Sequence, residues 1–214
     1  MRETAVPFAA FGKGDGCFSS ARRRKDAAVR LSCRLTESFH FAILNPKRKE
    51  VLSMAGKHVS ESYTEQVQIL SQSTLNGYNR LFGGQLMQWI DVVAAVVARR
   101  HSGCNVTTAS VDNLRFEGPA YANDTIVLCG YITYTGRTSM EVCVRTYVEE
   151  LSGLKRLINV AYLVMVALNA EERPTEVPKL VVESEAEKRE WEAACERNAI
   201  RKTRRKAAQK ELKG

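Results

Sequence analysis

The sequence predicts a domain of the α+β class, in which a curved antiparallel β-sheet is wrapped around one long central α-helix and a charged helix follows at the C-terminus. Residues 85–100 are apolar on nearly every face, which is typical of a buried helix. Four runs with strand character follow this helix, and a fifth precedes it. Consecutive strands on either side of one helix favour a sheet that curls around the helix and hides one of its faces.

The order of the elements can be followed along the chain. A short strand and a polar turn lead to a loop that begins at Asn76 and ends at Gly83 and Gly84, and the helix then runs to Arg100. Runs rich in β-branched and aromatic residues predict strands at residues 64–70, 105–116, 125–135, 139–149 and 157–168. The last of these is almost continuously apolar, as expected for a strand that is covered on both faces.

The distribution of charge divides the chain of 214 residues into three segments. Basic and acidic residues number 11 and 5 in residues 1–55, 11 and 12 in residues 56–180, and 10 and 7 in residues 181–214. The net charge of +8 therefore lies in the two ends, which argues against nucleic-acid binding by the central segment. We predict a basic extension over residues 1–55, one domain over residues 56–180 and a charged helical tail over residues 181–214.

The predicted extension has no sustained hydrophobic period of 2 or 3.6 residues, so we expect no packed element there. The first twelve residues lack a long apolar stretch, which argues against a secretory signal. A transit peptide is an alternative because the segment is basic and contains serines, although Glu3, Asp15 and three further acids oppose it. A third alternative is that translation begins at Met54.

The tail is acidic early and basic late, a distribution that complements the dipole of a helix. We expect this helix to dock on the domain through Trp191, Cys195 and Ile200. Contact of its basic end with a membrane or a nucleic acid is the alternative interpretation.

Two features of the central helix indicate chemistry. Gly83 and Gly84 lie at its start, where backbone N–H groups are unpaired and point along the positive end of the helix dipole. Such amides can form an oxyanion hole, although a tight turn with close packing would also need glycines. Asp91 is the one acid in the apolar run, and a buried, isolated carboxylate costs several kcal/mol unless it has partners. It is a candidate catalytic residue; the alternative is a structural acid bonded near Gln88.

The spacing of these groups predicts an assembly. Gly83 and Asp91 are eight residues apart, which is about 12 Å along one helix. A general base must reach within roughly 3 Å of the attacking water. If both groups are catalytic, Asp91 of one subunit faces the amides of another, and the protein is at least a dimer.

Four blocks of the sequence resemble the hot dog fold acyl-CoA thioesterases of the acyl-CoA hydrolase type: NGYNRLFGGQLMQWID, VTTASVDNLRF, GRTSMEV and VMVALNAEERPTEVP. The resemblance covers roughly residues 56–180. It implies hydrolysis of acyl-CoA thioesters to free fatty acid and coenzyme A, with no cofactor, by homodimers that assemble into a hexamer, a trimer of dimers. A non-catalytic module that binds and senses acyl-CoA is the alternative function.

The resemblance also implies roles for single residues. Asp91 matches a general base or nucleophile, Asn76 matches a loop residue that helps to place the water or the carbonyl, and Gly83 and Gly84 match the oxyanion amides. This chain departs from the family at Asn79, where a glycine is usual, so the shape of the loop and the role of Asn76 depend on that position.

A turn between two predicted strands resembles the segment that contacts coenzyme A in this family. It contains Arg137, Thr138 and Ser139, and a guanidinium with two hydroxyls suits phosphate and pantetheine groups. The alternative for Arg137 is a solvated turn residue.

Other classes of site are not indicated. The six cysteines include no CxxC pair, so we expect reduced thiols, a cytoplasmic location and no metal site. The central helix is too short and too charged at its end to span a membrane. His40, His58 and His101 fall outside the predicted pocket and are expected at the surface, which disfavours a hot dog dehydratase with a catalytic histidine.

Overall fold

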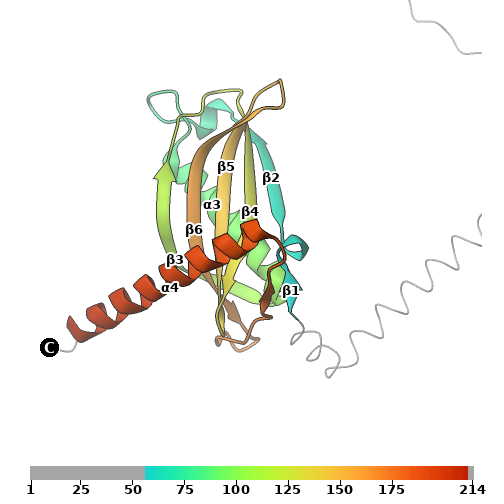
Figure 1. The fold of residues 1–214 in the computed structure, drawn as a ribbon. Helices are drawn as coiled ribbons and strands as arrows, with labels where there is room; N and C mark the ends of the chain where they lie inside the picture. The colour runs from blue at the N-terminus through green and yellow to red at the C-terminus, as the bar shows by residue number, and fades with distance from the viewer. Residues whose placement is uncertain (1–55, 212–214) are drawn as a thin grey trace, which may run out of the picture. The chain divides into compact units, whose positions relative to one another are not determined.

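The computed structural model describes residues 56–211. The predicted N-terminal extension and the alternative start at Met54 lie outside the described residues. The central feature is a five-stranded antiparallel sheet with the order β2-β4-β5-β6-β3, which curves around helix α3 (Figure 1). Its strands are β2 Thr64–Ile69, β3 Asn105–Phe116, β4 Thr125–Thr135, β5 Ser139–Glu149 and β6 Lys155–Leu168. The predicted α+β hot dog architecture is confirmed.

Two helices accompany the sheet on opposite faces. Helix α3 spans Gly83–Ser102 inside the curve, and helix α4 spans Glu185–Glu211 across the outer face (Figure 1). The short strands β1 Lys57–His58 and β7 Leu180–Val181 form a separate parallel pair. The 3₁₀ helices η1 Val59–Glu61 and η2 Gln72–Thr74 complete the described elements. These two- and three-residue elements were not predicted, because they are too short to show a hydrophobic period.

Helix α3 packs tightly on the sheet through one face. That face consists of the apolar residues Leu86, Ile90, Val93, Ala94, Val97 and Ala98, all of which are buried. Gly130 of β4 lies beneath it, and a Cβ atom there would be 2.6 Å from Val93 Cγ1 and 2.9 Å from Val97 Cγ2. The opposite face stays open: Met87 is 44% exposed and Val92 is 49% exposed. As predicted, the sheet hides one face of the helix only.

Several element boundaries differ from the prediction. Helix α3 ends at Ser102 instead of Arg100, and strand β2 ends at Ile69, one residue early. Helix α3 begins at Gly83, so both glycines belong to its first turn, because the Leu86 N–H already donates to the Phe82 carbonyl at 3.1 Å. Strand β6 begins at Lys155, two residues early, because this residue pairs with Glu149 in the ladder to β5.

The prediction that His101 lies at the surface was wrong. The last turn of α3 is covered, and the His101 side chain is fully buried with Nε2 3.1 Å from the carbonyl oxygen of Pro178. Burial lowers the pKa of this imidazole, which therefore stays neutral at pH 7. Its role is structural, because it joins the end of α3 to the segment before β7.

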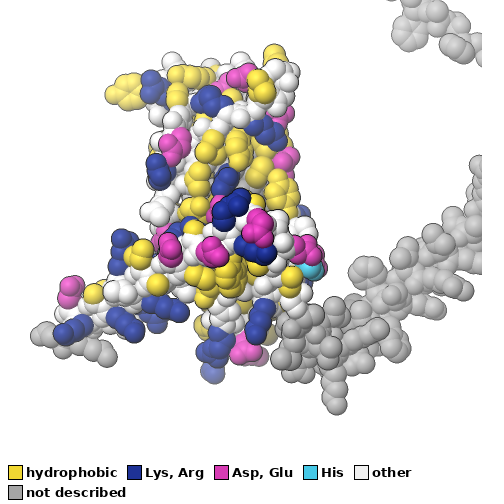
Figure 2. Space-filling model, in the orientation of Figure 1, with side chains coloured by type: hydrophobic (Ala, Val, Ile, Leu, Met, Phe, Trp, Pro, Cys, Tyr) yellow, Lys and Arg dark blue, Asp and Glu magenta, His cyan; other side chains and the backbone are white. Residues whose placement is uncertain are grey.

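Helix α4 is held on the sheet mainly by polar contacts. Its one buried residue is Ala194, and the Trp191 ring lies against Tyr134 with centroids 4.9 Å apart. Ile200, which was predicted to dock, is 52% exposed. Figure 2 shows charged side chains along α4 and hydrophobic side chains on the sheet beside it. Among residues 56–211, no helix combines the length and the apolar character needed to cross a bilayer.

Substituting Gly130 with alanine is expected to destabilise the fold by about 1–3 kcal/mol, because the added methyl group overpacks the contact between α3 and β4. Urea denaturation followed by circular dichroism measures this change. Gly77→Ala is the matched control, since a Cβ atom there meets nothing within 4 Å. Equal midpoints for the two variants would contradict the close approach at Gly130.

Candidate active site

Asp91 lies on the open face of α3 and is oriented by a threonine from the edge strand β3. The Thr108 hydroxyl donates a hydrogen bond of 2.6 Å to Asp91 Oδ1 and lies 3.6 Å from Met165 Sδ. In a single chain the Asp91 side chain is exposed, so the expectation of a buried carboxylate is wrong for the isolated subunit. The reason is that the sheet covers the other face of the helix.

Thr108 is the residue that the sequence argument missed. It stands in the second block of the family resemblance, next to Thr107 and Ala109, and nothing in the local pattern distinguishes it from its neighbours. The feature that identifies Thr108 is a hydroxyl group that points from strand β3 toward Asp91. Finding it requires the register of β3 against α3, which the sequence does not supply.

Gly83 and Gly84 form the first turn of α3 with free amides. Within the described residues, no acceptor is bonded to either N–H group. A Cβ atom at Gly83 would lie 3.3 Å from the Phe116 ring, and one at Gly84 would lie 2.6 Å from the Phe82 ring. Close packing against two aromatic rings is therefore one reason for glycine at both positions, and the role of the amides as an oxyanion hole stays a prediction.

The loop before the helix is shaped by Asn76. Its Oδ1 accepts hydrogen bonds from the backbone N–H groups of Tyr78 at 2.9 Å and Arg80 at 3.2 Å. Asn79 adopts φ +55°, in the left-handed region, which asparagine tolerates better than most residues. The turn therefore forms without the glycine that is usual in the family. Among residues 56–211, nothing accepts a hydrogen bond from the Asn76 Nδ2 group.

A cavity of about 340 Å³ lies beside this loop and the start of α3. It is lined by Asn76, Leu86, Phe116 and Ile158 among others. A larger cavity of about 480 Å³ lies beneath α4 and contains none of the predicted site residues. The described residues hold no cluster of three or more histidine, cysteine or acidic side chains that could bind a metal ion.

The predicted coenzyme A segment lies at the other end of the sheet. Arg137, Thr138 and Ser139 follow β4, and the exposed Arg137 guanidinium is 3.8 Å from a Glu176 carboxylate oxygen. The start of β4 is close to the loop that precedes α3, and a strand of this length spans roughly 33 Å. One chain therefore keeps this turn apart from the Gly83 and Gly84 amides, and it holds Asp91 two helical turns away from both amides.

Comparison with known proteins identifies the family. Residues 78–153 match the model of the thioesterase superfamily. The acyl-CoA thioester hydrolase YkhA of Bacillus subtilis, which is described as uncharacterized, is 38% identical over 135 residues, or 63% of this chain and 78% of that protein. The chain belongs to the thioesterase superfamily, in the group of hot dog fold acyl-CoA thioester hydrolases.

Solved structures of similar proteins have the same fold. The acyl-CoA hydrolase of Staphylococcus aureus in complex with butyryl coenzyme A and coenzyme A has a TM-score of 0.70 at 32% identity, covering 73% of this chain and 96% of that one. An apo-hexameric acyl-CoA thioesterase has a TM-score of 0.68 at 36% identity, covering 71% and 97%. The match spans only 24% to 38% of the mammalian relatives.

Three further structures of the S. aureus hydrolase carry single substitutions to alanine, of an asparagine, an aspartate 15 residues later and a threonine 17 residues after that. The same residue types occur here at the same separations, as Asn76, Asp91 and Thr108. The sequence argument had selected the first two of these residues, and the structure adds the third through its hydrogen bond.

Asn79→Gly is expected to preserve activity and to lower stability by less than about 1 kcal/mol, because glycine adopts φ +55° freely but loses more conformational freedom on folding. Asn79→Val is expected to destabilise the loop by about 1–3 kcal/mol, since a β-branched residue is strained there, and to lower turnover. Thermal unfolding and thioester hydrolysis measure the two effects. Tyr78→Val, at an exposed neighbour without a positive φ, is the control. A valine at position 79 that behaved like this control would contradict the assigned conformation.

Proposed function

We propose that this chain hydrolyses fatty acyl-CoA thioesters to the free acid and coenzyme A at a site built around Asp91. The observation that carries the proposal is the hydrogen bond of 2.6 Å from Thr108 to Asp91 on the open face of α3. This bond leaves the second carboxylate oxygen free for a water molecule or for the substrate. Membership of the acyl-CoA hydrolase group supports the same activity.

The reaction follows from the chemistry of these groups. Asp91 removes a proton from water as the water oxygen attacks the thioester carbon, or Asp91 attacks that carbon directly and water hydrolyses the acyl anhydride that remains after the thiolate has left. The amides of Gly83 and Gly84 stabilise the oxyanion of the tetrahedral intermediate. The C–S bond then breaks and the thiolate of coenzyme A leaves. Because a thiolate is a good leaving group, the reaction needs neither a strong general acid nor a cofactor.

Asn76 would assist from the loop beside the cavity. Its Oδ1 is occupied by the turn, so its Nδ2 group is the one that can donate to the attacking water or to the thioester carbonyl. In this way the Oδ1 atom of Asn76 would shape the loop while its Nδ2 group binds the substrate.

The site is composite in this proposal. Asp91 and the two amides are about 12 Å apart along one helix, so Asp91 of one subunit would serve the amides of a second subunit. Within residues 56–211, strand β3 has one edge without a neighbouring strand, and two such edges would join in a dimer. An antiparallel two-fold pair places opposite ends of the two sheets side by side, which would bring the Arg137 turn of one subunit toward the amides of the other.

Two observations support this assembly. Met87 and Val92 are exposed beside Asp91 in the single chain, and a second subunit would cover them. A 36% identical acyl-CoA thioesterase is hexameric, in keeping with a trimer of dimers.

A cytoplasmic location is part of the proposal and is supported by a mouse relative, 34% identical, that is named as cytosolic.

Asp91→Asn is expected to lower turnover of a chain-length series of acyl-CoA thioesters by about 10²–10⁴-fold, because the amide cannot act as a base. Thiol release measures turnover, and calorimetry with coenzyme A checks that binding persists. Gln88→Ala, on the exposed side of the same helix, is the control. A folded wild-type protein that binds coenzyme A without hydrolysing any member of the series would favour a sensing module instead.

Mixed dimers of one Asp91→Asn and one Gly84→Ala subunit are expected to have about half of the wild-type activity, because one of the two composite sites in each mixed dimer is intact. The two variants are coexpressed with different affinity tags, and mixed dimers are purified and assayed. Circular dichroism of each parent variant controls for folding. A site contained in one chain would leave the mixed dimers no more active than the average of their parents.

A further inference from the structure

Strand β3 contains an irregularity directly after Thr108. In the ladder to β6, Thr108 pairs with Met165 and Ser110 pairs with Val164, so Ala109 has no partner. Such a bulge changes which face of the sheet the following side chains occupy. Residues directly opposite in a ladder point to the same face, and Met165 is buried in the core. Thr108 therefore faces helix α3 and Asp91.

On the far side of the bulge, Asp112 faces outward. It pairs with Tyr162, whose ring lies under the Arg197 guanidinium of α4 at 3.8 Å. Residues 108 and 112 are four apart and would share a face in a regular strand. The bulge thus allows one short segment to present Thr108 to the active site and Asp112 to the outer helix.

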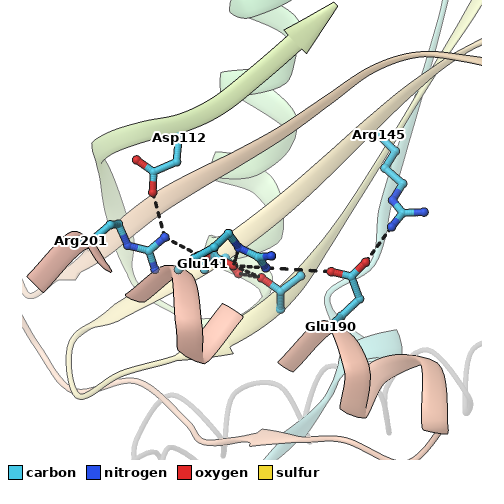
Figure 3. Close-up of polar contacts among 7 residues, drawn as sticks. Asp112, Glu141, Arg145, Glu190 and Arg201 are labelled. Atoms are coloured by element: carbon cyan, nitrogen blue, oxygen red, sulfur yellow. Dashed lines mark hydrogen bonds and ion pairs between the residues drawn. The ribbon is translucent and has the colours of Figure 1, made fainter. Parts of the chain in front are cut away.

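Helix α4 binds this outer face through an ion network (Figure 3). Glu141, on the central strand β5, is fully buried and accepts hydrogen bonds from Thr133 at 2.7 Å and from Arg197 at 2.7 and 3.1 Å. Arg201 Nη1 contacts Glu141 Oε2 at 2.5 Å and Asp112 Oδ2 at 2.8 Å. The Arg201 guanidinium therefore joins the central strand to the edge strand.

The contact between Arg201 and Asp112 is well placed to control the edge strand. Strand β3 pairs only with β6 in the sheet, and within residues 56–211 this contact is the one side-chain hydrogen bond between α4 and β3. Burial lowers the pKa of Arg197, but the hydrogen bonds to Glu141, together with the electrostatic attraction of Glu141, Tyr162 and Glu190, raise the pKa overall. The Arg197 guanidinium on the β5 side therefore stays charged.

We propose that Asp112 and Arg201 are positioning residues for thioester hydrolysis. Through them, α4 fixes β3 on the outer side of the bulge, and the fixed bulge holds the Thr108 hydroxyl at Asp91. This inference rests on the proposed function. A partner strand on the free edge of β3 would hold the strand through its backbone, while the outer face would still be held by the α4 of the same chain.

The test uses substitutions that keep α4 docked. Asp112→Asn removes the charge but leaves the contact between Arg201 and Glu141. Asp112→Glu keeps the carboxylate and is expected to recover most of the activity. Glu190→Gln is the matched control, because Glu190 of α4 pairs with Arg145 of β5 at 2.7 Å and with Arg197 at 4.0 Å and makes no direct contact with Asp112 or Arg201.

We expect Asp112→Asn to lower kcat about tenfold with a change of less than twofold in KM, since a small displacement of an orienting group slows chemistry more than binding. Glu190→Gln should leave both constants unchanged. Hydrogen exchange of the amides of residues 106–111 should be faster in Asp112→Asn than in the control.

Two results would separate the possible failures. An unchanged kcat in folded Asp112→Asn, whether or not β3 exchanges faster, would overturn the positioning role. A wild-type protein without turnover would overturn the proposed function instead. In that case hydrogen exchange still tests the contact itself: equal or slower exchange in Asp112→Asn would show that Asp112 does not hold β3 in place.

Discussion

The close packing of α3 against Gly130 is the contact on which the rest of this structure depends. Because a side chain at Gly130 would meet Val93 and Val97, the helix sits deep in the curve of the sheet and is covered along one face. The opposite face stays open, with Asp91 at its middle and free amides at its start. The proposed catalytic site and the proposed subunit interface therefore share the same uncovered surface.

The two long helices are attached to the sheet by different kinds of interaction. Helix α3 is held by apolar burial, which does not depend on direction, whereas α4 is held by charged hydrogen bonds with defined geometry. Breaking a buried ion pair by removing one partner is costly, so the network around Glu141 fixes α4 in one position. Because these hydrogen bonds have defined lengths and directions, they allow fewer positions of α4 on the sheet than an apolar contact would.

Much of this arrangement could be predicted from the sequence. The hydrophobic periods predicted α3 without its observed ends and strands β3, β4 and β5 with their observed bounds, and the composition of residues 183–214 predicted α4. Asp91 stood out because it is the one acid in an apolar run. Thr108 and Asp112 did not, since their roles depend on a bulge and on strand register. The burial of His101 was missed because its cover comes from a segment 77 residues later.

The backbone angle at Asn79 has a consequence for the unfolded chain. The loop needs a residue that accepts a positive φ, and both glycine and asparagine meet this need. Glycine loses more conformational freedom than any other residue when a chain folds. Asparagine reaches the same turn from a smaller set of unfolded conformations, so the loop before α3 is ordered at a lower entropic cost than a glycine loop of the same shape.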